Sequence, residues 1–253
     1  MTRQISFVLP AYNEEGNIEK MIADAVNSLG NLGCQFEIIV VDDGSNDTTA
    51  LIVEAVAARN SLVRLIRHPR NLGYGAAVLS GLSNANKGLV FFTDSDRQFD
   101  LAELAKMFDL IETADMVIGY RAPRRDPFMR RFNGKGWSFL VNLLFGYTAR
   151  DIDCAFKLIR SEVVRNLKDD IKSRGITFSA EFLVRAKGAG YRFAEVAIRG
   201  HRPRVAGTAT CAQTGVILRA FKELIDLRIM LWKEASRKRA KLGPISMTEE
   251  DEK

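Results

Sequence analysis

The sequence predicts an α/β fold with a mainly parallel sheet flanked by helices, and three observations support it. Short β-branched and aromatic runs alternate with segments whose apolar residues recur at helical spacing. Acidic side chains directly follow several of the apolar runs, where ligands gather in open α/β sheets. A basic amphipathic segment near the C-terminus predicts a further helix.

The first half of the chain contains five expected strands and four expected helices. The strands are expected at residues 5–9, 36–41, 62–66, 89–93 and 116–119. The helices are expected at residues 14–29, 47–58, 74–85 and 100–113, the third being small on one face. Because no G-x-G-x-x-G follows the first strand, neither a dehydrogenase nor a P-loop kinase is supported.

The second half departs from this alternation. After a basic loop we expect a helix at 136–145, a short segment at 151–158, a helix at 178–187, a strand at 193–198 and a helix at 215–233. We expect one domain over residues 1–241, with a nucleotide-binding half at about 1–119 and an acceptor half at about 120–241. Residues 242–253 are expected to form a disordered polar tail.

Composition excludes several classes of protein. The 253 residues are 47% hydrophobic, which excludes global disorder, and carry a net charge of +6, which fits an anionic partner. Three dispersed cysteines and two histidines predict neither a disulfide framework nor a zinc site. Uncharged stretches fall short of the roughly 18 residues that span a bilayer, and no secretion signal is evident, so we expect a cytoplasmic protein.

Polar residues follow the first two strands. The first expected strand is followed by Pro10, Tyr12 and Glu14, and the second is followed by Asp42 and Asp43. Carboxylates at the carboxyl edge of a parallel sheet can accept hydrogen bonds from a nucleobase or ribose. An ordinary Asp-Gly turn that caps the next helix is the alternative.

The fourth strand is followed by Asp94, Ser95, Asp96 and Gln98. Alternating carboxylates repel one another unless a cation or water separates them. Because Mg²⁺ and Mn²⁺ prefer carboxylate and amide oxygens, Asp96 and Gln98 are candidate metal ligands. A capped loop preceding a helix at Asp100 is the alternative, but three such strand ends at one edge favour a binding site.

The order and spacing of these motifs resemble the inverting family 2 glycosyltransferases. The resemblance rests on LPAYNEE, VVDDGSNDTT, HPRNLGYGAAVLSGL and FFTDSDRQFD. The later segments RDIDCAFKLIRSE, FSAEFLVRAKGAGYRFAEVAI and RPRVAGTAT are most similar to the dolichyl- and polyprenyl-phosphate sugar synthases, the group that includes dolichyl-phosphate mannose synthase. The resemblance implies a GT-A fold, a nucleotide-sugar donor and a divalent metal, Mg²⁺ or Mn²⁺.

The resemblance also implies roles for individual residues. The pocket for the base and ribose is lined by Pro10, Tyr12, Glu14 and Asp42 or Asp43. Asp94 faces the ribose and diphosphate, while Asp96 and Gln98 hold the metal. Ser95 stands where family members usually have alanine, and its small side chain preserves the turn. The candidate cations for the leaving diphosphate are Arg121, Arg130, Arg131 and Arg204, although solvated arginines are the alternative.

In the acceptor half, Asp151 and Glu181 match positions characteristic of the lipid-phosphate subgroup. Cys154, which replaces the subgroup's serine, is expected to be a packed small residue and not a nucleophile. A phosphate acceptor is already anionic and needs no general base, whereas an alcohol needs a carboxylate such as Asp151 or Glu181. Glu181 as a buried structural carboxylate is the alternative.

The predicted activity is metal-dependent, inverting transfer of a sugar from GDP-mannose or a UDP-sugar to a polyprenyl or dolichyl phosphate. A soluble alcohol or saccharide acceptor is the enzymatic alternative. A nucleic-acid-binding protein is a distant one, because unmetallated carboxylates at three strand ends would repel phosphates.

The basic segment 215–241 has two interpretations. Its apolar residues are expected on one broad face, namely Ile217, Ala220, Phe221, Leu224, Ile225, Leu231 and Trp232. Such a helix can lie on an anionic membrane surface and make the protein a peripheral one. A domain-closing helix with a solvated basic end is the alternative.

Overall fold

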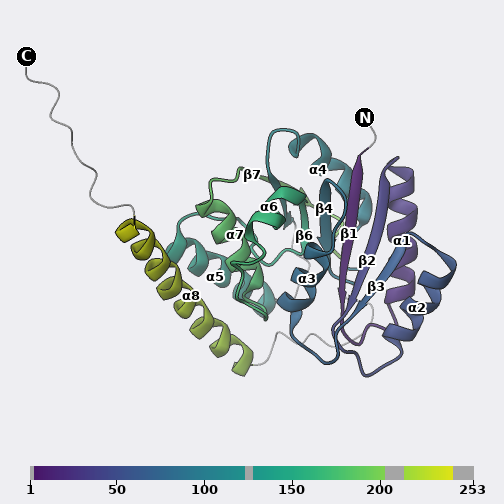
Figure 1. Cartoon of the computed structure of the whole chain (residues 1–253), viewed down its shortest axis with the longest axis horizontal. Coiled ribbons are helices and arrows are strands. Elements are labelled where there is room, and N and C mark those ends of the chain that lie inside the picture. The colour runs from purple at the N-terminus through teal and green to yellow at the C-terminus, as the bar shows by residue number, and fades with distance from the viewer. Residues whose placement is uncertain (1–2, 123–127, 203–213, 242–253) are drawn as a thin grey trace, which may run out of the picture.

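The computed structural model describes residues 3–122, 128–202 and 214–241. A central sheet is covered by helices on both faces, and the long helix α8 packs at one end of the molecule (Figure 1). The fold is therefore the expected α/β arrangement. None of the described helices contains a stretch long and apolar enough to cross a membrane.

The sheet has seven strands in the order β3-β2-β1-β4-β6-β5-β7. Their bounds are Gln4–Ala11 for β1, Gln35–Asp42 for β2, Val63–Arg67 for β3, Leu89–Thr93 for β4, Met116–Arg121 for β5, Phe156–Arg160 for β6 and Phe193–Ile198 for β7. The pairs β1–β2, β1–β4, β2–β3 and β5–β7 are parallel. Among the described strands, β6 alone runs antiparallel to its neighbours, β4 and β5. The sheet is thus mainly parallel, as predicted, and β6 forms the end of the short segment expected at 151–158.

The helices confirm the predicted alternation, with several corrections to their bounds. They are α1 Ile18–Asn31, α2 Thr49–Arg59, α3 Tyr74–Ser83, the 3₁₀ helix η1 Leu101–Leu104, α4 Ala105–Leu110, α5 Phe128–Phe145, α6 Ser161–Leu167, α7 Phe178–Gly188 and α8 Thr214–Lys241. The helix expected from residue 14 begins later, because the N–H groups of Asn17 and Ile18 bond the Glu14 carbonyl in a separate turn. The helix expected at 100–113 is divided into η1 and α4, α6 was not predicted, and α5 and α8 are longer than expected.

Two hydrophobic layers hold the helices to the sheet. One layer packs α1, α2 and α4 against one face, and the other packs α3, α5, α6, α7 and α8 against the opposite face. In the first layer a row of aromatic rings crosses neighbouring strands. The ring centroids of Phe7 and Phe91 are 5.1 Å apart, and those of Phe91 and Phe156 are 4.7 Å apart. This row joins β1, β4 and β6 into one rigid centre.

The small residues predicted on α3 have two neighbours, namely the sheet at Gly81 and the segment 174–178 at Gly75. Gly75, Ala76, Ala77 and Gly81 are all buried. A β-carbon at Gly81 would collide with the Cγ1 atom of Val8 on β1. Gly81 therefore lets α3 approach β1 closely, and Gly75 lets it approach the segment 174–178.

Replacement of Gly81 by Ala is expected to destabilise the protein by about 1–3 kcal/mol, because the added methyl group overpacks the contact with Val8. Gly88→Ala is the matched control, since a β-carbon there meets nothing within 4 Å. Urea unfolding of both variants measures the difference. Equal stabilities for the two variants would contradict the packing argument.

Candidate active site

The carboxyl ends of β1, β2 and β4 meet at one edge of the sheet. β1 lies between the other two strands, and Ala11 at its end is paired in register with Asp42 at the end of β2. On the other side, the Ser95 hydroxyl donates to the Pro10 carbonyl over 2.7 Å. The serine that replaces the usual alanine therefore ties the end of β4 to the end of β1.

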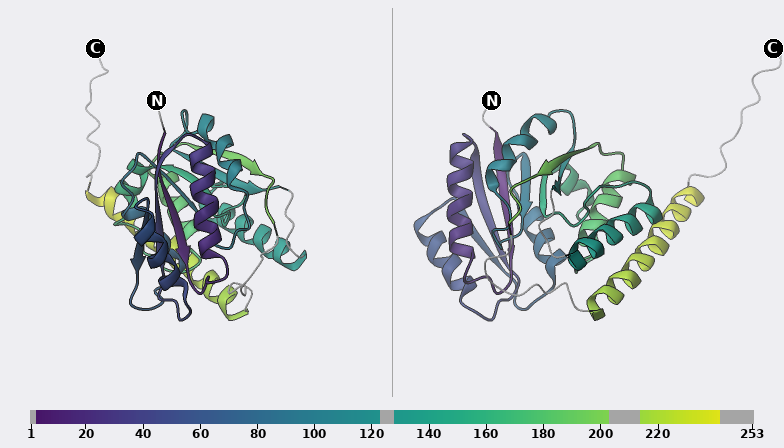
Figure 2. Two further views of the ribbon diagram at one scale, coloured as in Figure 1. Left: turned by 90° about the vertical axis from the view of Figure 1, so that its right-hand side faces the viewer. Right: turned by 180° about the vertical axis from the view of Figure 1, so that it is seen from behind.

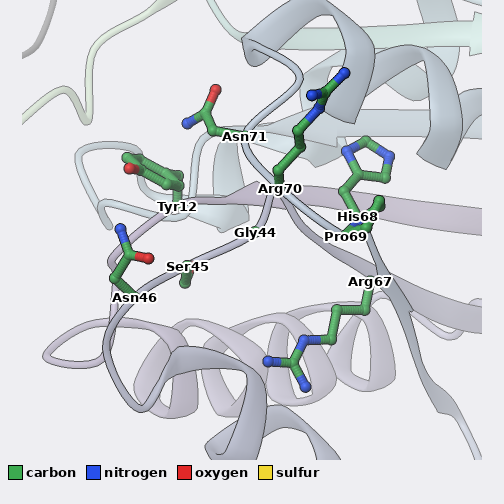
Figure 3. A pocket seen from close by; sticks show the side chains of 9 residues that line it. All are labelled: Tyr12, Gly44, Ser45, Asn46, Arg67, His68, Pro69, Arg70 and Asn71. Atoms are coloured by element: carbon green, nitrogen blue, oxygen red, sulfur yellow. The ribbon is translucent and has the colours of Figure 1, made fainter.

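A cavity of about 510 Å³ opens beside the ends of β1, β2 and β3 (Figure 3). It is lined by Tyr12, Gly44, Ser45, Asn46 and residues 67–71. Tyr12 was a predicted donor-binding residue, and it is 37% exposed. Arg70 and Asn71 were not predicted, although they follow β3 directly and the strand-end rule that identified the other loops applies to them. Arg67 Nη1 lies 3.9 Å from Glu54 Oε1 of α2.

Asp43 organises one wall of this cavity. Its Oδ1 atom lies 2.7 Å from His68 Nδ1 and accepts from the Leu72 N–H, and its Oδ2 atom accepts from the Gly73 N–H, both over 2.9 Å. The other His68 nitrogen lies 2.9 Å from the Ser80 hydroxyl. His68 is thus a loop residue, as expected, in a network that shapes the segment 68–73.

Asp42 is fully buried beside Asp43. Its Oδ1 atom accepts from the Ser45 N–H over 3.2 Å, and its Oδ2 atom lies 3.7 Å from Arg67 Nε. Of the two aspartates, Asp43 therefore makes more hydrogen bonds to the loop that follows β3. Contact of Asp42 or Asp43 with a nucleobase remains a prediction.

The loop after β1 is fastened to the loop after β2. The Asn13 N–H donates to Ser45 Oγ, and Asn13 Oδ1 accepts from the Asn46 N–H, both over 2.9 Å. Glu14 is 7% exposed, and its Oε2 atom accepts from the Asn17 side chain over 2.7 Å. Glu14 thus helps to shape the loop that presents Tyr12, and contact of its carboxylate with a donor stays a prediction.

Asp94 and Asp96 occupy different surroundings. The Tyr74 hydroxyl, at the start of α3, donates to Asp94 Oδ1 over 3.0 Å. Asp96 is 6% exposed, and its Oδ1 atom accepts from the Gln98 N–H over 3.2 Å. Tyr74 escaped sequence reasoning because its helical position carried no sign that its hydroxyl reaches the end of β4.

Among the described residues other than glycine, Asn13 and Arg97 have positive φ angles, of 55° and 58°. Both lie in loops of this site. Such backbone is sparsely populated by residues with a β-carbon and persists where surrounding contacts hold it. Arg97 is held by an ion pair in which its Nε atom lies 2.8 Å from Asp24 Oδ2. This pair fixes the turn that presents Asp96 and Gln98.

The donor set at Asp96 and Gln98 fits a hard divalent cation. The Gln98 amide nitrogen donates to the Arg202 carbonyl over 3.0 Å, which leaves the amide oxygen as its ligand atom. Within the described ranges, no three carboxylate, imidazole or thiol groups converge on one point. A cation here would therefore take oxygens from a diphosphate and water to complete its shell, as Mg²⁺ commonly does.

The antiparallel strand β6 brings a second loop to the same edge. Phe156, its first residue, pairs with Thr93, the last residue of β4. The preceding residues 151–155 therefore lie next to Asp94. Here Arg121, at the end of β5, donates two hydrogen bonds of 2.8 Å to Asp151, from Nε to Oδ2 and from Nη2 to Oδ1. The two predicted residues form a nearly buried ion pair, which sequence reasoning did not anticipate.

Two buried side chains, those of Cys154 and Lys157, lie in or next to this loop. Burial raises the pKa of the Cys154 thiol to about 12, and the residue is 0% exposed, so the prediction of a packed cysteine is confirmed. Lys157 is also fully buried, and its ammonium group donates to the carbonyls of Ile152 and Cys154. Burial lowers the pKa of the Lys157 ammonium. The lysine holds the backbone of the loop that carries Asp151.

Glu181 lies inside α7 and is 0% exposed. Its carboxylate accepts from the N–H groups of Lys172 and Ser173 and pairs with Arg185 Nε at 2.8 Å. Arg185 in turn pairs with Glu234 of α8 at 2.9 Å. These partners fit the alternative of a structural carboxylate, which joins α7, α8 and the segment 171–175.

The remaining predicted cations cannot be placed in the site. Arg204 lies outside the described residues, as does the predicted tail at 242–253. Arg130 and Arg131 belong to the first turn of α5, but their side chains are outside the described part. Arg202 is the last described residue before this range, and its N–H donates to the Gln98 carbonyl over 2.7 Å.

Comparison with known proteins gives concordant matches. The family model of glycosyl transferase family 2 matches residues 6–168, more than half of the chain. Dolichyl-phosphate beta-glucosyltransferase ALG5C of Trichomonas vaginalis is 33% identical over 211 residues, covering 76% of this chain and 62% of that protein. Dodecaprenyl-phosphate galacturonate synthase of Rhizobium johnstonii is 27% identical over 169 residues, covering 65% of this chain and 50% of that protein. The chain thus spans less than two thirds of the length of these two relatives.

Solved structures share the fold. Glucosyl-3-phosphoglycerate synthase of Mycobacterium tuberculosis, in complex with Mn²⁺, UDP-glucose and phosphoglyceric acid, superposes with a TM-score of 0.64 at 20% identity, covering 89% of this chain and 80% of that one. The expected GT-A-like architecture is therefore confirmed. The family model, which matches residues 6–168, shows that the chain belongs to glycosyl transferase family 2.

Proposed function

We propose that the protein transfers a sugar, with inversion and with the help of Mg²⁺ or Mn²⁺, from a nucleotide sugar to a polyprenyl phosphate. The observation that carries the proposal is the similarity to two proteins named for dolichyl-phosphate and dodecaprenyl-phosphate substrates. The similarity to ALG5C extends over 76% of the chain. GDP-mannose and UDP-sugars are both candidate donors.

The cavity and the adjoining strand ends suit a nucleoside diphosphate. Tyr12 offers an aromatic face to a base, while Asn46 and Asn71 offer amide groups to its polar edge or to the ribose. The diphosphate would extend toward Asp96 and Gln98, the proposed ligands of the metal. When bound, that cation would neutralise charge developing on the leaving nucleoside diphosphate.

The surroundings of the two candidate bases favour an anionic acceptor. Both Asp151 oxygens accept hydrogen bonds from Arg121, and both Glu181 oxygens accept from neighbouring N–H groups. Carboxylates committed in this way are suited to positioning and poorly suited to removing a proton from an alcohol. A phosphate oxygen can attack the anomeric carbon without such help. Arg121 and Asp151 then act by holding the loop 151–155 beside Asp94.

The decisive experiment offers labelled UDP-glucose or GDP-mannose, with Mn²⁺, to a polyprenyl phosphate and separately to soluble alcohols and saccharides. We expect label in the organic phase only with the polyprenyl phosphate and its matching donor. Product confined to the aqueous phase would establish the soluble-acceptor alternative instead. Salt-sensitive binding of DNA or RNA, with no response to any nucleotide sugar, would support the nucleic-acid alternative.

Replacement of Asp96 by Asn is expected to lower kcat/KM about 10²- to 10³-fold, the range typical of losing one fixed electrostatic contact to the transition state. The amide keeps an oxygen for the Gln98 N–H, so the fold should persist. Steady-state kinetics and the Mn²⁺-dependent thermal shift with donor measure the effect. Asp109→Asn, at an exposed site on α4, is the control. Activity of the Asp96 variant equal to that of the control would refute the metal assignment.

Replacement of Glu181 by Gln is expected to lower the free energy of unfolding by about 1–3 kcal/mol, because the buried hydrogen bonds lose their charged acceptor. The kcat of the folded variant should stay within about twofold of wild type, because a structural carboxylate takes no part in the chemical step. Urea unfolding and kinetics on the same preparation test both statements. Exposed Glu112→Gln is the control. A large loss of kcat with unchanged stability would identify Glu181 as a base.

A further inference from the structure

Helix α8 carries two apolar stripes, where one broad face was expected. Ala220, Leu224 and Leu227 are 4%, 0% and 3% exposed and pack against the body of the protein. A second stripe points outward and consists of Phe221, Ile225, Ile229 and Trp232, which are 44%, 55%, 46% and 63% exposed. Residues spaced by three and four positions share a side of a helix, so these four form one outward surface. We call it the outer stripe.

The charged residues of α8 are divided between the same two sides. Glu223 accepts from the Thr177 hydroxyl over 2.6 Å, and Glu234 pairs with Arg185, so both acids are used by the protein body. The exposed basic side chains on the described part of the helix are Lys222, Arg228, Lys233 and Arg237. Of these, Arg228 also lies over the Phe145 ring of α5, with its Cζ atom 5.9 Å from the ring centroid. The exposed acid Asp226 lies 3.3 Å from Lys222. The outward side of the helix is therefore both apolar and positively charged.

We propose that α8 docks the protein on an anionic lipid surface, with the outer stripe buried among the acyl chains nearest the headgroups. Helices with a tryptophan-containing apolar face and flanking lysine and arginine bind such surfaces through apolar burial and charge together. The choice of lipid as the occupant rests on the proposed function, whose acceptor carries a lipid. A second copy of this chain fits less well, because two such faces would bring like charges together.

The outer stripe belongs to a helix that is packed firmly against the rest of the protein. Figure 2 shows α8 lying along α5 at the end of the protein, and the Trp137 and Phe221 rings meet edge to face with centroids 6.4 Å apart. The buried stripe and the Arg185–Glu234 pair fix the roll of the helix about its axis. Docking through the outer stripe therefore sets the orientation of the whole sheet relative to the membrane.

The test is co-sedimentation with vesicles of phosphatidylcholine containing phosphatidylglycerol, compared with phosphatidylcholine alone. We expect binding to the anionic vesicles that weakens with salt. The double variant Ile225→Ser/Trp232→Ser should lower the partition coefficient about tenfold or more, because both side chains lose apolar burial. Leu51→Ser/Leu62→Ser is the matched control, since these leucines are 61% and 40% exposed on the opposite part of the fold. Equal loss in both variants, or equal binding to both vesicle types, would overturn the proposal.

Tryptophan emission gives a second readout on the full chain. The sequence contains two tryptophans, so Trp137→Phe leaves Trp232 as the single reporter. We expect its emission to shift to shorter wavelength on anionic vesicles and to be quenched by lipids brominated near the headgroup. An unchanged spectrum would overturn the proposal, as would concentration-dependent dimerisation that the Ile225/Trp232 double variant abolishes while vesicles remain unbound.

The failure of this proposal is distinguishable from that of the proposed function. Transfer to a detergent-solubilised polyprenyl phosphate without any vesicle binding would refute docking and leave the acceptor assignment standing. Vesicle binding without transfer to polyprenyl phosphate would do the reverse.

Discussion

The direction of β6 is the constraint that brings Asp151 to the strand ends of the site. β6 begins at the edge where β4 and β5 end, so the loop before it lies beside both of their final residues. A parallel strand in the same place would put this loop at the opposite edge, about 16 Å away for a strand of five residues. Asp151 would then be separated from Asp94 and Arg121, which would stay at the ends of β4 and β5.

Around this edge, much of the ionisable chemistry serves to shape loops. Asp43 gathers the segment after β3, Lys157 holds carbonyls of the loop before β6, and Glu181 gathers the segment 171–175. Buried charges are costly unless paired and hydrogen-bonded, so such groups are placed where they satisfy several donors or acceptors at once. The loops of the site are in this way held in place by contacts within the protein itself.

Much of the fold could be predicted, because apolar periodicity and strand-end polarity are local signals. They located β7 at its observed bounds and predicted that the ends of β1, β2 and β4 converge. The direction of β6, the Arg121–Asp151 pair and the Tyr74–Asp94 hydrogen bond arise from contacts between distant segments, which no local pattern encodes. The second apolar stripe of α8 escaped for a related reason, since periodicity cannot say which apolar residues a neighbour covers.

A continuous series of contacts runs from the cavity at the strand ends to α8. Asp43 holds Gly73 at the start of α3, the Ala76 N–H bonds the Arg174 carbonyl, and the segment around Arg174 is gathered by Glu181, whose partner Arg185 reaches Glu234. Thermodynamic linkage requires any free energy passed along this series to act equally in both directions. If binding of a surface to α8 raised the affinity of the cavity for its ligand, the bound ligand would raise the affinity of α8 for that surface by the same factor. Residence at that surface and occupancy of the cavity would then rise and fall together.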